Sequence, residues 1–257
     1  MRDLMPEKRK RIVIKFGTGI LTRHHSNSLD TKQFRRLTTE VAQLARLGHQ
    51  ILLVSSGAVG AGLMLLKMRD RPKELSLVQA CAAVGQSRLM RMYETFFSRH
   101  GFHVAQLLLS HQDIDSRRRY VNARNTLERL LEFKNVIPVI NENDSVAVEE
   151  LKLGDNDRLS AEVAILAHAD LLVILTSVPG LLDGGKRLIK RVTKIDSVAH
   201  LANKETGIYS TGGMVTKLQS VGMAVKSGIP SIIASGLEPG VLASVLTSKP
   251  RGTFFEV

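Results

Sequence analysis

The chain has 257 residues, of which 44% are hydrophobic and 23% are charged, a balance typical of a folded protein that excludes disorder throughout. A single cysteine, Cys81, excludes an internal disulfide framework and a metal site built from several cysteines. Basic residues exceed acidic ones by 36 to 24, which favours anionic partners: nucleic acid, an anionic membrane, or phosphorylated and carboxylated substrates. Aromatic residues are only 4% and tryptophan is absent, which argues against a surface on which single-stranded bases stack.

No segment has the composition of a membrane anchor. The longest weakly polar stretch, residues 51–66, falls short of the ~20 apolar residues that a spanning helix needs. Lys15 interrupts the apolar segment behind the basic N-terminus, so no signal-peptide core follows. We therefore expect a cytoplasmic protein without membrane contact.

Short apolar runs rich in β-branched residues predict strands. They do not alternate with polar residues, which is typical of strands buried on both faces. The predicted strands are residues 12–16, 51–54, 104–109, 136–140, 171–176 and 231–234.

Helical patterns lie between these runs. In the first, Phe34, Leu37 and Val41 recur at helical spacing, Asp30 can cap the start, and Gly48 ends it. The predicted helices are residues 31–47, 75–99, 122–133, 159–167 and 215–227. The alternation predicts the α/β class, with a mainly parallel sheet covered by helices on both faces. Ligands of such sheets bind at the carboxyl ends of the strands.

Two of the loops after strands combine glycine with features that suit an anion. Lys15 lies inside the first predicted strand, just before Gly17 and Gly19, where an anion would compensate a buried ammonium group. The second strand runs through Ser56 and Gly57 into a helix, without a dinucleotide or Walker pattern. Ordinary alternatives are a lysine whose head reaches solvent at a strand end, and close helix–strand packing through glycine.

Two polar clusters and a glycine pair follow later strands. Residues 141–144 (Asn-Glu-Asn-Asp) and 154–157 (Gly-Asp-Asn-Asp) could hold an α-amino group or organise lysines and Mg²⁺, although such residues also form turns and caps. Residues 211–217 place two glycines, a threonine and Lys217 at a helix start, which suits phosphate. The alternative for this segment is a flexible turn with a capping threonine.

These motifs, in this order over nearly the whole chain, resemble the amino acid kinase family. Residues 83–89, 122–124 and 233–236 add to the likeness. Residues 85–87 (Gly-Gln-Ser) and 141–144 distinguish the branch that phosphorylates L-glutamate from relatives acting on acetylglutamate, carbamate, aspartate or UMP. The resemblance implies that ATP and L-glutamate give ADP and L-glutamyl 5-phosphate, the first step of proline biosynthesis.

The resemblance also implies an αβα sandwich made of a single kinase domain, residues 1–257. Its N-terminal lobe, about residues 1–165, would bind the amino acid, and its C-terminal lobe, about residues 166–257, the nucleotide. The implied catalytic residues are Lys15, Lys217 and Asp157, with Asp157 orienting the lysines. The implied substrate-binding residues are Ser56, Gly57, Asn141, Asp144 and Asn156. The implied nucleotide-binding residues are Lys15, Thr176, Ser177, Thr211, Gly212, Gly213, Met214 and Lys217.

Further expectations concern cofactors and partners. ATP would carry Mg²⁺, with no protein side chain assigned to the metal. We expect a homo-oligomer, a dimer or tetramer, with proline as feedback inhibitor and no nucleic-acid partner. Many members carry a C-terminal PUA domain, an RNA-binding type of module, and this chain stops where the family's kinase domain ends. We expect either a short form without a PUA domain or a chain cut from a longer protein.

The sequence departs from the family pattern at the expected nucleotide loop. Thr176-Ser177 stands where Thr-Asp is usual, and residues 178–183 form a shortened loop without the usual tyrosine, which puts the adenosine contacts in question. Two alternatives stay open: another kinase that forms an acyl phosphate, such as acetylglutamate kinase, and an RNA-binding regulator that has lost catalysis.

Overall fold

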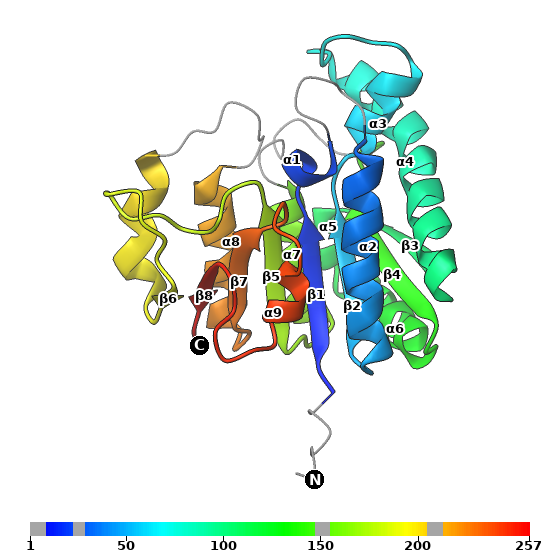
Figure 1. Cartoon of the computed structure of the whole chain (residues 1–257). Coiled ribbons are helices and arrows are strands. Elements are labelled where there is room, and N and C mark those ends of the chain that lie inside the picture. Colours follow the sequence, from blue (N-terminus) through cyan, green and yellow to red (C-terminus); the bar gives the residue numbers. More distant parts are fainter. Residues whose placement is uncertain (1–8, 23–28, 147–154, 205–212) are drawn as a thin grey trace.

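The computed structural model describes residues 9–22, 29–146, 155–204 and 213–257, and within them one eight-stranded sheet forms the centre (Figure 1). The strand order is β3-β4-β2-β1-β5-β7-β8-β6. All neighbouring strands are parallel except β7 and β8, which are antiparallel. The strands are β1 (Arg11–Phe16), β2 (Gln50–Ser55), β3 (His103–Leu109), β4 (Val136–Glu142), β5 (Leu171–Thr176), β6 (Arg191–Val192), β7 (Ser231–Ser235) and β8 (Thr253–Phe255).

The six predicted strands are confirmed to within one or two residues at their ends. The sequence did not predict β6 and β8, because two- and three-residue strands are too short to show a hydrophobic period. The helices are α1 (Thr18–Leu21), α2 (Thr31–Arg46), α3 (Ala58–Leu65), α4 (Leu75–Phe97), α5 (His111–Asp115), α6 (Arg117–Glu132), α7 (Asp155–Leu166), α8 (Met214–Lys226) and α9 (Val241–Ser244), with 3₁₀ segments η1 (Ser98–His100) and η3 (Ile195–Lys204).

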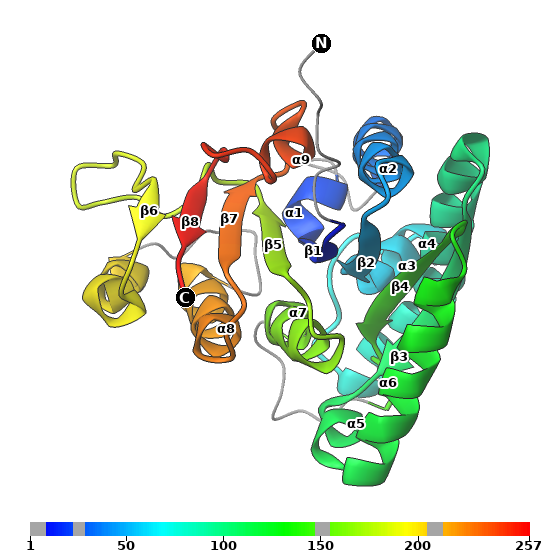
Figure 2. The same ribbon diagram turned by 90° about the horizontal axis from the view of Figure 1, so that it is seen from below.

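Helices cover both faces of the sheet, so the predicted αβα sandwich is confirmed. One apolar core lies between the sheet and α2, α4 and α9, and a second lies between the sheet and α6, α7 and α8. Figure 2 shows α2 and α9 on one side of the central strands and α7 and α8 on the other. None of the helices in the described ranges is long and apolar enough to cross a membrane.

Two helix starts differ from the prediction. Helix α6 begins at Arg117 rather than at residue 122, because its first turn is basic and carries no apolar period. Helix α7 begins at Asp155 rather than at residue 159, so Asn156 and Asp157 lie in the first turn of a helix and not in a loop. In contrast, α2 starts as predicted, with the Asp30 side chain accepting from the backbone N–H groups of Lys32 (2.9 Å) and Gln33 (3.2 Å).

Helices α3 and α4 pack with their backbones in contact. A Cβ atom on Gly85 would lie 1.8 Å from the carbonyl oxygen of Ala58, and one on Gly62 would lie 1.8 Å from that of Cys81. No side chain fits at either position, so both helices depend on glycine at their crossing. The close crossing fixes the position of the residues next to Gly85.

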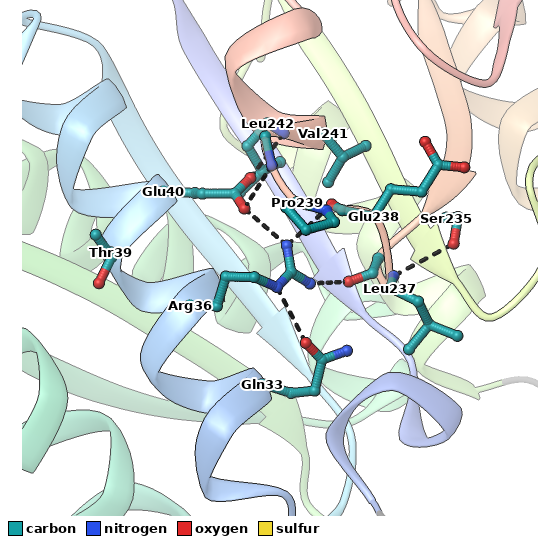
Figure 3. Close-up of polar contacts among 12 residues, drawn as sticks. Gln33, Arg36, Thr39, Glu40, Ser235, Leu237, Glu238, Pro239, Val241 and Leu242 are labelled. Carbon is teal, nitrogen blue, oxygen red and sulfur yellow. Dashed lines mark hydrogen bonds and ion pairs between the residues drawn. The ribbon is translucent and has the colours of Figure 1, made fainter.

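A buried carboxylate joins α2 to the segment between β7 and α9 (Figure 3). Glu40 accepts from the backbone N–H groups of Gly240 and Leu242, each at 3.0 Å, and pairs with Arg36 at 2.7 Å. Arg36 in turn donates to the carbonyl oxygen of Glu238 at 2.9 Å. Glu40 therefore accepts from the free N–H groups at the start of α9 and, with Arg36, holds the segment between β7 and α9 against α2.

We expect Glu40→Ala to lower the free energy of unfolding by about 2–4 kcal/mol, because two backbone donors and a guanidinium group lose their partner. Urea unfolding followed by circular dichroism measures the change. Gln43→Ala, at an exposed position of the same helix, is the matched control and should shift stability by less than about 0.5 kcal/mol. Equal effects of the two substitutions would contradict a specific role of the Glu40 contacts.

Candidate active site

One carboxylate contacts two lysines where β1, α7 and α8 meet. Asp157, in the first turn of α7, lies 2.7 Å from Lys15 of β1, measured from Oδ1 to Nζ. Its other oxygen, Oδ2, lies 3.1 Å from Nζ of Lys217, in the first turn of α8. The exposed fractions of Lys15, Asp157 and Lys217 are 5%, 2% and 5%, so the group is buried. The structure thus brings together the three side chains that the sequence assigned to catalysis.

The alternation of side chains along β1 explains how Lys15 reaches this point. Ile12, Ile14 and Phe16 belong to the core on the α2 side, whereas Val13 belongs to the core on the α7 and α8 side. Lys15 shares the face of Val13 because successive side chains of a strand point to opposite faces. At the carboxyl end of β1 its ammonium group therefore faces the starts of α7 and α8.

The electrostatics of the group are those of a buried carboxylate between two cations. Burial alone would raise the pKa of Asp157, but the charges of Lys15 and Lys217 and their hydrogen bonds hold it below its ordinary value. Burial lowers the pKa of Lys217, an effect that Asp157 opposes and that the charge of Lys15 reinforces. Two ammonium groups against one carboxylate leave the site ready for an anion.

Ser56, Asn141 and Asn156, which the sequence assigned to substrate binding, form a second, polar group beside the first. The Nδ2 atom of Asn156 donates to Oγ of Ser56 at 3.1 Å and to Oδ1 of Asn141 at 3.0 Å. Asn141 also contacts Gln86 of α4, with 2.9 Å between Nδ2 and Oε1. Because Asn156 directly precedes Asp157, the amide group and the lysine group are neighbours.

Glycines are neighbours of both groups along the chain. A Cβ atom on Gly17 would lie 3.2 Å from the carbonyl oxygen of Leu175 and 3.4 Å from Nζ of Lys15, so a side chain there would crowd the carbonyl and contact the lysine head. Gly57 precedes α3 with a φ of 106°, a conformation that favours glycine. Gly213 precedes α8, so backbone N–H groups at the start of that helix lie near Lys217.

The remaining predicted site residues are placed less tightly. Thr176 is half-buried at the end of β5, and Ser177 is exposed just beyond it. Asp144 is half-buried in the turn after β4, and Met214 is buried at the start of α8. Thr211 and Gly212 lie outside the described residues. The assignment of these residues to substrate or nucleotide therefore stays a prediction.

The sequence did not assign roles to two contacts near the site. Thr216 donates from Oγ1 to Oδ2 of Asp157 at 3.0 Å, a contact that its place beside Lys217 could have suggested. His111, at the start of α5, lies 3.1 Å from Glu162 of α7, which also pairs with Arg158 at 2.7 Å. The hydrogen bond with Glu162 raises the pKa of His111. This buried pair joins the edge of the sheet to α7, and no sequence pattern links residues 51 positions apart.

The donor set of the site fits phosphate better than a resident metal. Among the described residues, no three His, Cys, Asp or Glu side chains are grouped so as to hold a metal ion. Two lysines and the start of α8 are instead the groups that bind phosphate oxygens in proteins.

Comparison with known proteins identifies relatives of this chain. A sequence model of the amino acid kinase family matches residues 10–235. The glutamate 5-kinases of Geobacter metallireducens and Moorella thermoacetica are each 46% identical to this chain, over 99% and 96% of its length. The chain spans 70% and 66% of the length of these two relatives. Among solved structures, Giardia carbamate kinase aligns over 97% of this chain and 99% of its own with a TM-score of 0.66 at 17% identity, which shows a shared fold.

We expect Asp157→Asn to lower the free energy of unfolding at pH 7 by about 3–5 kcal/mol, because it leaves two buried ammonium groups without a counter-charge. The folded-state pKa of Asp157 lies below the ordinary value of 3.8, so its stabilisation is complete above pH 3.8 and is lost as pH falls through the folded pKa. The difference between wild type and variant should therefore narrow in acid. Urea unfolding at several pH values from 7 to 3 measures it, and a constant difference would contradict the ion-pair account.

Proposed function

We propose a reaction for this chain on the premise that the chain belongs to the amino acid kinase family. Its reaction transfers the γ-phosphoryl group of ATP to the γ-carboxylate of L-glutamate and gives ADP and L-glutamyl 5-phosphate, the first step of proline biosynthesis. The observation that carries this proposal is the contact of Asp157 with both Lys15 and Lys217. Asp157 holds two ammonium groups at a place where a phosphoryl group could pass from ATP to the carboxylate of glutamate.

The chemistry requires positioning and charge rather than a base. A carboxylate is already a nucleophile, so no proton has to be removed before it attacks the γ-phosphorus. The main barrier is repulsion between the anionic acceptor and the polyphosphate, which positioned cations reduce. Lys15 and Lys217 supply this charge, and Asp157 fixes the direction of both ammonium groups. Mg²⁺, bound to the phosphates of ATP, would neutralise further negative charge.

The amide group favours an amino acid with a free α-amino group. Asn156 and Asn141 lie beside the lysines, and Asp144 follows the same strand end as Asn141. An ammonium group is charged, has three donors, and is recognised by carbonyl and carboxylate oxygens. An N-acetylated amine is neutral and has a single N–H donor, so it needs fewer of these oxygens. This distinguishes glutamate from N-acetylglutamate, the substrate of the alternative kinase.

The nucleotide would bind on the other side of the lysines. Gly213 and Met214 at the start of α8, with Thr176 and Ser177 at the end of β5, are the described candidates for its contacts, and they belong to the C-terminal lobe. Location in the cytoplasm, assembly into a dimer or tetramer, and inhibition by proline stay predictions of the resemblance. A non-catalytic RNA-binding role is disfavoured, because it would not need two lysines buried against one carboxylate.

Formation of ADP in the presence of Mg²⁺ tests the proposal. We expect ADP formation to depend on L-glutamate, and N-acetylglutamate and aspartate to support at least about 100-fold lower kcat/KM, because each lacks a matching group or length. A higher kcat/KM for N-acetylglutamate than for L-glutamate would show that N-acetylglutamate is the substrate. Absence of turnover together with salt-dependent binding of RNA would favour the regulatory alternative.

Lys217→Ala should lower kcat about 10²–10³-fold with a smaller change in KM for ATP. Charge shifts toward the departing ADP in the transition state, so Lys217 acts more there than in the ground state. Lys217→Arg should restore only part of the rate, because a planar guanidinium group does not replace a compact ammonium group. Steady-state kinetics measure both variants, and near-wild-type kcat of Lys217→Ala with intact circular dichroism would refute the role.

A further inference from the structure

The amide side chains of the site are oriented by one backbone group. The N–H of Glu142 donates to Oδ1 of Asn141 at 2.9 Å. A backbone N–H can only donate, so this contact identifies the oxygen of the Asn141 amide. Its nitrogen must then be the atom that faces Gln86. The end of β4 thereby sets the direction of every hydrogen bond that follows.

The donor and acceptor assignments that follow from the Asn141 oxygen leave two amide atoms without a hydrogen-bond partner. Asn141 donates to Oε1 of Gln86, which leaves the Gln86 Nε2 group as a donor. Asn156 donates through Nδ2 to both Ser56 and Asn141, which leaves its Oδ1 as an acceptor. Both atoms are buried, and neither has a hydrogen-bond partner among the residues that the structure describes. Buried polar atoms without partners are rare in folded proteins, and a ligand is one of the groups that satisfies them.

A zwitterionic amino acid supplies the complement of this pair. Its α-carboxylate accepts hydrogen bonds and its α-ammonium group donates them. We infer that Gln86 donates from Nε2 to the α-carboxylate of the substrate, while Oδ1 of Asn156 accepts from the α-ammonium group. This inference rests on the proposed function, and it adds Gln86 to the residues that bind the substrate.

The order of the amides decides which carboxylate Gln86 meets. Asn156 adjoins Asp157 in α7, and Gln86 lies at the far end of the chain of hydrogen bonds, on α4. The carboxylate that receives phosphate must lie beside Lys15 and Lys217, at the Asp157 end. The carboxylate at the Gln86 end is therefore the one that does not react.

The backbone next to Gln86 packs closely against the backbone of α3. A Cβ atom on Gly85 would lie 2.4 Å from the backbone nitrogen of Gly62 as well as 1.8 Å from the oxygen of Ala58. The α4 backbone at residue 85 thus lies directly against α3, with no room for a side chain between them. The Cα atom from which the Gln86 side chain extends is therefore set by this helix crossing.

The test compares Gln86→Met, which keeps the length of the side chain and removes the donor, with Gln43→Met, an exposed control on α2. We expect Gln86→Met to raise KM for L-glutamate about 10- to 100-fold, the usual loss for a hydrogen bond to a charged group, with little change in KM for ATP. The control should leave both values unchanged. Equal rises in both KM values, or no rise for glutamate, would overturn the inference.

Substrate analogues separate a direct contact from a structural effect. 4-Aminobutyrate lacks the α-carboxylate of glutamate, and glutarate lacks the α-amino group. As competitive inhibitors of wild type, both should bind more weakly than glutamate. In Gln86→Met the inhibition constant of 4-aminobutyrate should stay within about twofold of the wild-type value, because this analogue has no α-carboxylate for Gln86 to contact. The inhibition constant of glutarate should rise about 10- to 100-fold. Equal weakening of both analogues would show that Gln86 acts only through the fold.

Turnover of glutamate by the wild-type enzyme separates a failure of the proposed reaction from a failure of the Gln86 inference. If wild type fails to phosphorylate glutamate, the proposed function fails before any variant is compared. If wild type phosphorylates glutamate and Gln86→Met behaves as the Gln43→Met control, the reaction stands and the role of Gln86 falls.

Discussion

The site depends on one buried carboxylate that compensates two buried ammonium groups. Without Asp157, Lys15 and Lys217 would repel each other in a region where water cannot screen them, and a buried charge without a partner is strongly destabilising. With Asp157, both ammonium groups are held in fixed directions and one positive charge remains in excess. That excess is what an anionic phosphoryl group would meet.

The parallel sheet makes this arrangement possible. Strands β1, β2 and β4 end at the same edge, so the lysine of the first, the serine after the second and the asparagine of the third lie together. Helices α7 and α8 begin at the same edge and add Asn156, Asp157 and Lys217 there. The two kinds of chemistry, charge for phosphate and amides for an amino acid, are thereby placed side by side.

The sequence predicted most of the fold and the lysine–aspartate group. The features that it did not predict have physical reasons for being missed. Hydrophobic runs and helical periods predicted six strands and the main helices, and the resemblance to the amino acid kinase family predicted Lys15, Asp157 and Lys217 as one group. The start of α7 was missed because its first turn is polar, and β6 and β8 were missed because they are too short. The directions of the amides around Gln86 depend on a backbone hydrogen bond from Glu142, which no residue pattern encodes.

Trapping of the product with hydroxylamine tests the central claim, that the lysine–aspartate group transfers phosphate to a carboxylate. An acyl phosphate reacts with hydroxylamine to give a hydroxamate, whereas phosphate transferred to water gives none. Wild type should form γ-glutamyl hydroxamate in proportion to ADP, and Asp157→Asn should lose both products together. ADP formed without hydroxamate, or hydroxamate formed by Asp157→Asn at the wild-type rate, would contradict the account.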